Sequence, residues 1–221
     1  MLLDGCGNAG KGLLSRILAI LDSDVEFHHR TGRRHPSRLA LLPGTFNPPT
    51  IAHIALAHAA QPLVDEVVFV LPQLLPHKNH FGATLAERVE LLKAADHQAS
   101  IATTEGGLYI EIAHEFRAHF GPGTHISLLC GRDAAERILT WDYGRAGVVE
   151  EMLAEFEVLV APRRGEFDPP SDREHRMKKL DLLSPMDEIS STELRARIAG
   201  GEPWEHLVPG GIVERVRKIY S

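Results

Sequence analysis

The sequence has few cysteines, and that scarcity excludes two kinds of small protein. Cys6 and Cys130 are the only two among 221 residues, so they cannot build a disulfide framework. Neither lies in the Cys or His spacing of a zinc site, and the 13 histidines are scattered rather than clustered. We therefore expect a protein of a reducing compartment, the cytoplasm, with no metal ion held by its own side chains.

Long apolar runs and an excess of positive charge are missing as well. No stretch approaches the roughly 18 consecutive apolar residues of a membrane span. The opening residues, MLLDGCGNAGKG, lack the basic and apolar regions of a secretory signal. The net charge of -6 argues against a general nucleic-acid binder. We expect neither a membrane nor a nucleic acid among the partners, and the sequence leaves a homo-oligomer open.

The remaining composition is that of an ordinary globular protein, with 43% hydrophobic and 24% charged residues. The length suffices for one well-buried domain. Residues 1–37 differ from the rest, because an amphipathic run from Leu13 to Leu21 is followed by the polar, basic stretch HHRTGRRHPSR. We predict a helix and a linker for this N-terminal extension, and a main domain over residues 38–221 that ends in a helical segment.

A glycine-rich stretch, GCGNAGKG at residues 5–12, has the outline of a phosphate-binding loop. Gly12 stands where a P-loop needs Ser or Thr, and only four residues precede the stretch, so a strand can hardly lead into it. We discount phosphate binding there, and a P-loop kinase is the least favoured alternative.

Short apolar runs alternate with helical patterns along the main domain. This alternation predicts an α/β fold, a Rossmann-like doubly wound parallel sheet with helices on both faces. Ligands of such sheets bind at the carboxyl ends of the strands. The predicted strands are 38–42, 64–71, 125–130, 156–161 and 180–183, and the predicted helices are 50–61, 85–95, 111–120, 150–155, 192–199 and 211–220.

The first candidate site is GTFNPPTIAH at residues 44–53, where a strand leads through a tight loop into a helix. That layout aims backbone N–H groups at an anion. Thr50 and His53 are three residues apart, so they share one face of the first helical turn. A hydroxyl and an imidazole there could grip phosphate oxygens. In the structural alternative, Thr50 caps the helix and His53 fills space.

The second candidate site is ISSTELR at residues 189–195. Ser190 and Glu193 have the spacing of a capping box, which predicts a helix start. Its N–H groups and hydroxyls would form a phosphate cradle, to which Arg195 adds charge. Taken alone, a plain capped helix is the simpler interpretation, and the presence of the first site favours the functional one.

Together the two motifs resemble those of the nucleotidyltransferase (cytidylyltransferase-like) superfamily. Its members carry GxFxPxHxGH or a Thr-led version, followed late in the chain by ISSTxxR, and here the two stand in that order about 140 residues apart. Within the superfamily, the chain looks most like the bacterial nicotinate-nucleotide adenylyltransferases, from about Arg38 onward. Further similar segments are LPHK at 75–78, ERVELLKAA at 87–95, LLCGRDAAERILTW at 128–141, FEVLVAPRRG at 156–165 and HLVPGGIVERVRKIY at 206–220.

The resemblance implies an enzyme of NAD biosynthesis that joins AMP from ATP to nicotinate or nicotinamide mononucleotide and releases pyrophosphate. A phosphate oxygen of the acceptor attacks the α-phosphate of ATP, so no side-chain nucleophile is needed. Catalysis then consists of positioning and of stabilising negative charge. Mg²⁺ bound through the ATP phosphates is the expected cofactor.

The resemblance also implies roles for individual residues. His53 would contact the α-phosphate, Thr50 the triphosphate or the acceptor phosphate, and Arg195 the β- and γ-phosphates. The expected catalytic residues are His53, Thr50, Lys78 and Arg195, and the expected acceptor-binding residues are Lys78, Tyr109 and Trp141. The expected ATP-binding residues are Gly44, Thr45, Phe46, Asn47, His53, Arg88, Gly131, Asp133, Ile189, Ser190, Ser191, Thr192 and Arg195.

Departures from the family pattern keep other acceptors open. Thr50 stands where most nicotinate-nucleotide enzymes have His, as in the pantetheine-phosphate adenylyltransferases, and Ala52 replaces the usual Gly. The Tyr-Thr or Asp-Thr pair that helps recognise the pyridine ring is not found near Tyr109. Phosphopantetheine or another phosphorylated acceptor, with ATP or CTP as donor, is therefore one alternative. A nucleotide-binding regulator without turnover is another.

Overall fold

A seven-stranded sheet runs through the part of the chain that the computed structural model describes, which comprises residues 25–73, 82–141, 143–144, 146–162, 165, 167–182, 186 and 189–220. The strand order is β1-β4-β3-β2-β5-β6-β7, and all neighbours are parallel except β1 and β4. The strands are β1 (Glu26–His29), β2 (Arg38–Pro43), β3 (Glu66–Pro72), β4 (Ser100–Thr104), β5 (His125–Gly131), β6 (Glu157–Ala161) and β7 (Met177–Lys179).

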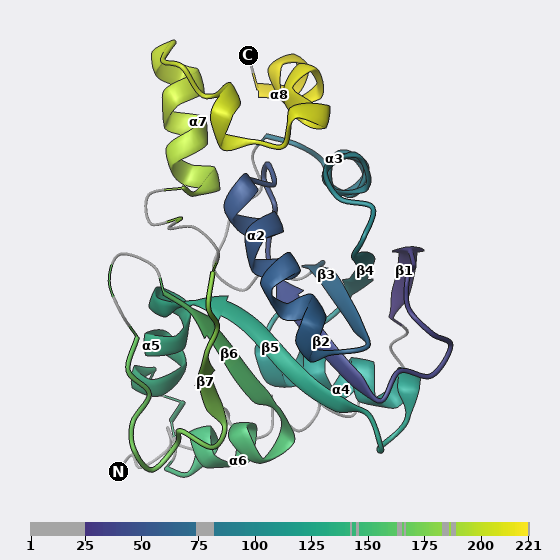
Figure 1. The fold of residues 1–221 in the computed structure, drawn as a ribbon, viewed down its shortest axis with the longest axis vertical. Coiled ribbons are helices and arrows are strands. Elements are labelled where there is room, and N and C mark those ends of the chain that lie inside the picture. The colour runs from purple at the N-terminus through teal and green to yellow at the C-terminus, as the bar shows by residue number, and fades with distance from the viewer. Residues whose placement is uncertain are drawn as a thin grey trace, which may run out of the picture.

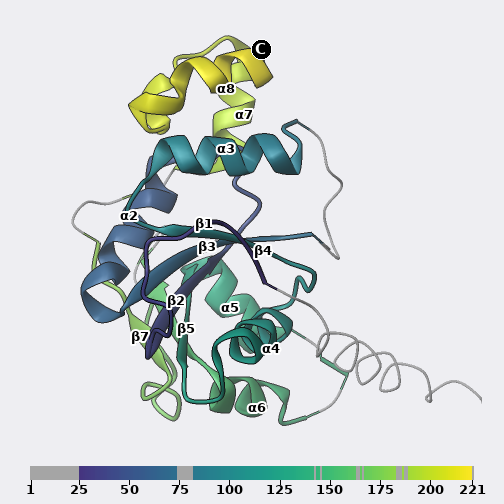
Figure 2. The ribbon, with the colours of Figure 1, turned by 90° about the vertical axis from the view of Figure 1, so that its right-hand side faces the viewer.

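Helices cover both faces of this sheet, which confirms the predicted doubly wound architecture (Figures 1 and 2). The helices on one face are α2 (Ile51–Ala60) and α3 (Leu85–Ala95), and those on the other are α4 (Tyr109–Phe120), α5 (Arg132–Thr140) and α6 (Val148–Glu155). Beyond one end of the sheet lie α7 (Ser191–Gly200) and α8 (Val213–Tyr220), and short 3-10 turns span Gln61–Leu63, Glu205–Leu207 and Gly210–Ile212. Among the described residues, no helix has both the length and the apolarity that crossing a membrane requires.

The strands alternate their side chains between two apolar cores. In β2, Leu39 and Leu41 pack on the side of α4, α5 and α6, whereas Ala40 and Leu42 pack on the side of α2 and α3. Both faces of the sheet are covered, so polar side chains are disfavoured on either side of the strand. Its sequence is therefore a continuous apolar run.

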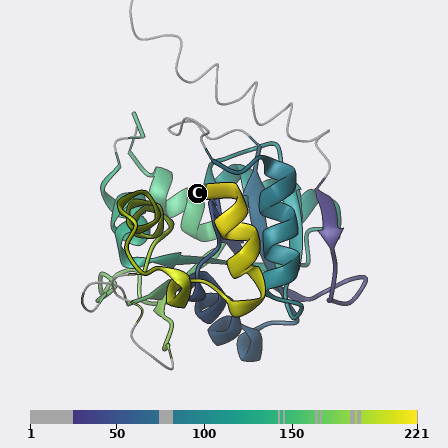
Figure 3. The same ribbon diagram turned by 90° about the horizontal axis from the view of Figure 1, so that it is seen from above.

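A third, smaller core joins the C-terminal segment to α3. Leu91 of α3 packs with Leu194 of α7 and Val216 of α8, and Figure 3 shows α8 lying beside α3. Helix α7 ends at Gly201, whose φ of 69° is the left-handed conformation that glycine adopts without steric cost. The C-terminal segment thereby holds the start of α7 over the body of the domain.

The structure corrects two sequence-based predictions. The linker expected before Arg38 contains β1, whose Phe27 packs edge-on against Phe116 of α4 at a centroid distance of 6.1 Å. The polar residues of this segment give no apolar pattern from which an edge strand could be predicted. The last strand, predicted at 180–183, lies at Met177–Lys179. Its two exposed lysines give no apolar pattern in the sequence, and an edge strand tolerates such residues. The predicted helix over Leu13 to Leu21 lies outside the described residues.

The order in which successive strands are placed in the sheet changes direction between β2 and β5. From β2 the chain proceeds outward through β3 and β4, and then it returns to place β5 on the other side of β2. The loops that leave β2 and β5 therefore diverge, which opens a crevice at the carboxyl ends of these strands.

Candidate active site

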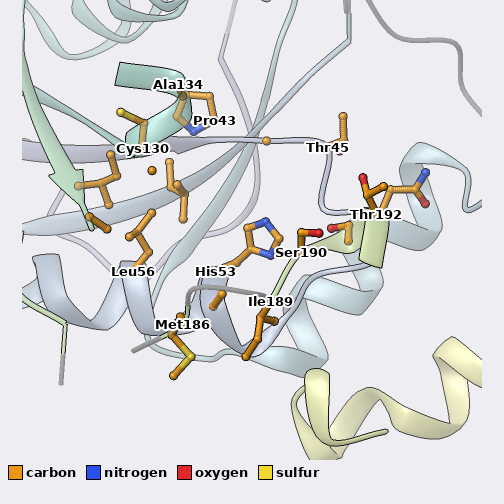
Figure 4. Close-up of a pocket in the computed structure, with 18 of the residues that line it drawn as sticks. Pro43, Thr45, His53, Leu56, Cys130, Ala134, Met186, Ile189, Ser190 and Thr192 are labelled. Atoms are coloured by element: carbon orange, nitrogen blue, oxygen red, sulfur yellow. The ribbon is translucent and has the colours of Figure 1, made fainter. Parts of the chain in front are cut away.

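A cavity of about 740 Å³ lies at this crevice (Figure 4). The loop after β2 lines it with Gly44 and Thr45, α2 contributes His53, β5 contributes Gly131, and α7 contributes Ser190 as its N-cap. Segments distant in the sequence thus meet at the edge where a parallel sheet binds its ligands.

The ring of His53 is held in one orientation. The backbone N–H of Thr50 donates to Nδ1 of His53 at 3.0 Å. Because a backbone amide can only donate, Nδ1 is the acceptor and the proton of the neutral imidazole resides on Nε2. Phe46 packs edge-on against the same ring at a centroid distance of 5.1 Å and is itself backed by Phe69. His53 is among the residues that line the cavity.

Thr50 supports His53 and does not line the cavity. Its side chain is 0% exposed, and its hydroxyl lies 2.8 Å from Nδ1 of His53. We had expected this hydroxyl to contact a phosphate, and its burial places it behind the imidazole instead. Thr50 is also the N-cap residue of α2, as the structural alternative predicted.

The two predicted motifs are joined directly. Ser191 donates from Oγ to the carbonyl of Pro48 at 2.7 Å, and Arg195 donates from Nη1 to the carbonyl of Asn47 at 2.5 Å. Residues about 140 positions apart therefore form one surface, as their pairing in the sequence suggested. Tyr220, at the end of α8, hydrogen-bonds the side chain of Asn47 and so ties the C-terminal segment to the same loop.

Helix α7 begins at the cavity with Ser190 as its N-cap, as predicted. The hydroxyl of Ser190 accepts from the N–H of Glu193 at 3.1 Å, and a hydroxyl that accepts one bond can still donate its proton. Only the serine half of the predicted capping box forms, because the carboxylate of Glu193 accepts from Nε of Arg197 at 2.9 Å. The first-turn N–H groups and the positive end of the helix dipole favour an anion here.

Arginines supply the charge of the cavity. Its described lining includes Arg88, Arg137 and Arg195, and no carboxylate. Arg88 is only 3% exposed and donates to the carbonyl of Thr45 at 2.9 Å. Burial lowers the pKa of its guanidinium, but an arginine stays charged in proteins. The cavity is thus suited to a ligand with several negative charges.

The loop after β4 is fixed by two buried carboxylates. Glu115 accepts from the N–H groups of Glu105 and Gly106, at 3.1 and 2.7 Å. Glu111 accepts from those of Gly107 and Leu108, both at 3.0 Å. Four consecutive amides are therefore already bonded, and the two acidic residues have a structural use.

Several predicted site residues lie outside the cavity. Phe46 is buried beneath His53 with 1% exposure. Asp133 faces solvent on α5, because Ala134 and Arg137, one turn apart, form the face that lines the cavity. Trp141, the C-cap of α5, is 53% exposed. The helix carries it away from the carboxyl edge by roughly 14 Å at 1.5 Å per residue. Lys78 lies outside the described residues.

Other lining residues were not predicted from the sequence. Arg137 belongs to a helix that we did not predict, and Leu182 and Met186 come from the irregular chain before α7. Cys130 also lines the cavity, and burial raises the pKa of its thiol to about 12. The thiol therefore stays protonated, as suits a residue of the apolar core rather than a nucleophile.

Comparisons with known proteins point to one family. The model of the family described as cytidylyltransferase-like matches residues 41–197. A probable nicotinate-nucleotide adenylyltransferase of Moorella thermoacetica is 30% identical over 202 residues, which cover 82% of this chain and 90% of that protein. One from Thermus thermophilus is 30% identical over 190 residues, covering 82% and 97%.

Solved structures share the fold. A nicotinic acid mononucleotide adenylyltransferase of Plasmodium falciparum, complexed with APC, superposes with a TM-score of 0.58 at 15% identity, covering 82% of this chain and 94% of that one. The same enzyme complexed with NaAD gives a TM-score of 0.57 at 17% identity, covering 82% and 89%.

Proposed function

The chain belongs to the cytidylyltransferase-like family and is a nucleotidyltransferase of the nicotinate-nucleotide adenylyltransferase type, and from this premise we propose that it joins AMP from ATP to nicotinate mononucleotide. The acceptor phosphate attacks the α-phosphate, the bond to the β-phosphate breaks, and pyrophosphate leaves. The observation that carries the proposal is the direct bonding of the loop around Asn47 and Pro48 to the start of α7, with His53 facing the cavity between them.

In this mechanism His53 stabilises charge at the α-phosphate. Its Nε2–H donates to a non-bridging oxygen, where negative charge grows as the new bond forms. Because Thr50 and Phe46 already fix the ring, the donor needs no reorganisation during the reaction, which is the condition for electrostatic catalysis. The residue requires no change of protonation state.

The start of α7 would hold the leaving pyrophosphate. Ser190 and Thr192 line the cavity together with Arg195, and a helix N-terminus binds phosphate through its free N–H groups. Arg195 also lies 3.5 Å from the hydroxyl of Thr192, from Nη2 to Oγ1. Arg88 adds a buried charge from α3. These groups together offset the charge of the triphosphate.

An apolar wall on the α2 and β6 side suits the adenine ring. This wall borders the phosphate-binding part and offers flat packing without competing charges. It comprises Leu56, Ala161, Pro162, Leu182, Met186 and Ile189.

Magnesium would be bound by the phosphate oxygens of ATP. Among the described residues, no group of three or more His, Cys, Asp or Glu side chains could hold a metal ion. Such an ion neutralises phosphate charge and orients the chain of phosphates.

Pyrophosphate release with Mg²⁺ and ATP tests the proposal. Nicotinate mononucleotide, nicotinamide mononucleotide and phosphopantetheine are supplied separately to the wild type and to His53→Ala. We expect release with nicotinate mononucleotide and a fall in kcat of about a hundredfold to a thousandfold in the variant, the usual cost of one preorganised donor. ATP binding and the unfolding temperature of the variant serve as controls. Both should stay close to the wild-type values, because His53 is partly exposed.

Each other outcome has a distinct meaning. Near wild-type turnover by His53→Ala would refute the catalytic role. Release only with phosphopantetheine would keep the chemistry and change the acceptor, an alternative that the threonine at position 50 favours. ATP binding without release for any acceptor would support a regulator.

A further inference from the structure

One of the three arginines of the cavity has no place in the phosphate-binding part. Arg88 and Arg195 both donate to carbonyls of the loop after β2, at Thr45 and Asn47. Arg137 reaches the cavity from α5, on the opposite face of the sheet. Since no carboxylate lines the described cavity, Arg137 confers positive charge on a second part of it.

Arg137 lines the cavity together with Tyr109 and Cys130. Its Nε donates to the carbonyl of Asp133 at 3.2 Å, which turns the side chain back toward the start of α5 and the carboxyl edge of β5. Burial raises the pKa values of the Tyr109 phenol and the Cys130 thiol, and the charge of Arg137 acts against both shifts. Tyr109 and Cys130 line the cavity as well, so the three residues form one pocket.

Among the described residues of the neighbouring loop, the backbone N–H groups are already bonded. The neighbouring loop exposes four amides in sequence, but Glu111 and Glu115 already accept from all of them. In the part of the chain that the structure describes, no ion pair joins Arg137 to a carboxylate. A negatively charged group in the pocket would therefore meet the guanidinium of Arg137.

We infer, building on the proposed function, that Arg137 selects the acceptor by pairing with the carboxylate of its pyridine ring. The phosphate of the acceptor reacts at His53, and the apolar wall accommodates adenine. The pocket of Tyr109 and Arg137 is then the place left for the acceptor's own ring. A guanidinium pairs with a carboxylate through two parallel hydrogen bonds. The neutral carboxamide of nicotinamide mononucleotide offers no such charge, so nicotinate mononucleotide is the preferred acceptor.

Acceptor preference in Arg137→Gln tests this role. The ratio of kcat/KM for nicotinate mononucleotide to that for nicotinamide mononucleotide is compared with the wild type. We expect kcat/KM for the acid to fall by about tenfold to a hundredfold, the usual worth of hydrogen bonds to a charged group. The value for the amide should change by less than about threefold. Calorimetric binding of each mononucleotide gives a readout independent of turnover.

Arg132→Gln is the matched control, because it removes the same charge from the same helix. Arg132 pairs with Glu136 at 3.3 Å and does not line the cavity, so its loss should leave the ratio unchanged. Arg137→Lys should keep part of the preference. An unchanged ratio in Arg137→Gln, or equal losses for both acceptors, would overturn the role of Arg137 alone. No turnover of either mononucleotide by the wild type would refute the proposed function and this role with it.

Discussion

At position 50, burial decides what a threonine can do. The motif suggested a hydroxyl on a phosphate, yet the side chain is fully enclosed and bonds Nδ1 of His53. Sequence spacing correctly placed Thr50 and His53 on one helical turn. It could not tell whether both face the ligand or one supports the other, because that depends on the backbone of the loop before the helix.

Thr50→Val separates these two possibilities. The substitution keeps the shape of the side chain and the N–H that fixes the tautomer, and it removes only the hydroxyl. We expect kcat to fall by about threefold to tenfold, the worth of one hydrogen bond, with the KM for ATP unchanged. Thr50→Ser, which restores the hydroxyl, should recover the rate. A large rise in KM at constant kcat would instead identify Thr50 as a phosphate ligand.

Helix α7 is the element that completes the cavity, and its docking depends on few bonds. Ser191 links its first turn to the carbonyl of Pro48, while Arg195 links its second turn to Asn47. Further support comes from Leu194 and Ile198, which pack in the small C-terminal core. The position of the phosphate-binding groups at the start of α7 therefore depends on these contacts.

Ser191→Ala should loosen this docking. The carbonyl of Pro48 loses its partner, so we expect unfolding free energy to drop by about 1 kcal/mol. The Kd for ATP, followed by calorimetry, should rise by about fivefold for the same energy. Arg197→Gln is the comparison within the same helix, because it breaks only a partly exposed pair with Glu193 and should change stability by less than about 0.5 kcal/mol. Equal effects of the two variants would contradict a specific role for Ser191.

Elements with periodic apolar residues were predictable, and those without were not. Helix α3 was predicted with its observed bounds, Leu85–Ala95. Strand β4 was missed because Ser100, Thr103 and Thr104 are polar although buried. Helix α5 was missed because few of its residues enter the core, so charged side chains dominate its sequence. The missed helix brings Arg137, so the part of the cavity around Tyr109 was predicted without its arginine.

At the scale of the whole molecule, the free energy of unfolding should depend on pH through Asp65, which lies directly before β3. Asp65 accepts from the N–H groups of Ser37 and Arg38, at 2.8 and 2.9 Å. The bond from Arg38 is the main cause that holds the pKa of this carboxyl below its ordinary value. A carboxyl with a lowered folded-state pKa stabilises the fold above its unfolded pKa. That contribution is lost as pH falls through the folded-state value.

Asp65→Asn should therefore be less stable than the wild type near neutral pH, and the difference should vanish in acid. The asparagine oxygen still accepts both bonds, so the comparison isolates the charge. Urea midpoints at about pH 7 and about pH 3 measure the effect, on either side of the ordinary range of Asp. Asp172→Asn removes the same charge from an exposed turn and is the control for the loss of one negative charge. A difference between Asp65→Asn and wild type that persists in acid would contradict the carboxylate's role.

The bonds between distant parts of the chain also set when activity can arise during synthesis on the ribosome. Asn47 and His53 are translated early, but the partners of this loop follow 143 residues later at Ser191 and 173 later at Tyr220. A nascent chain can build most of the sheet before it contains a phosphate cradle. Products of premature termination before α7 would lack its phosphate-binding residues, so we expect them not to consume ATP.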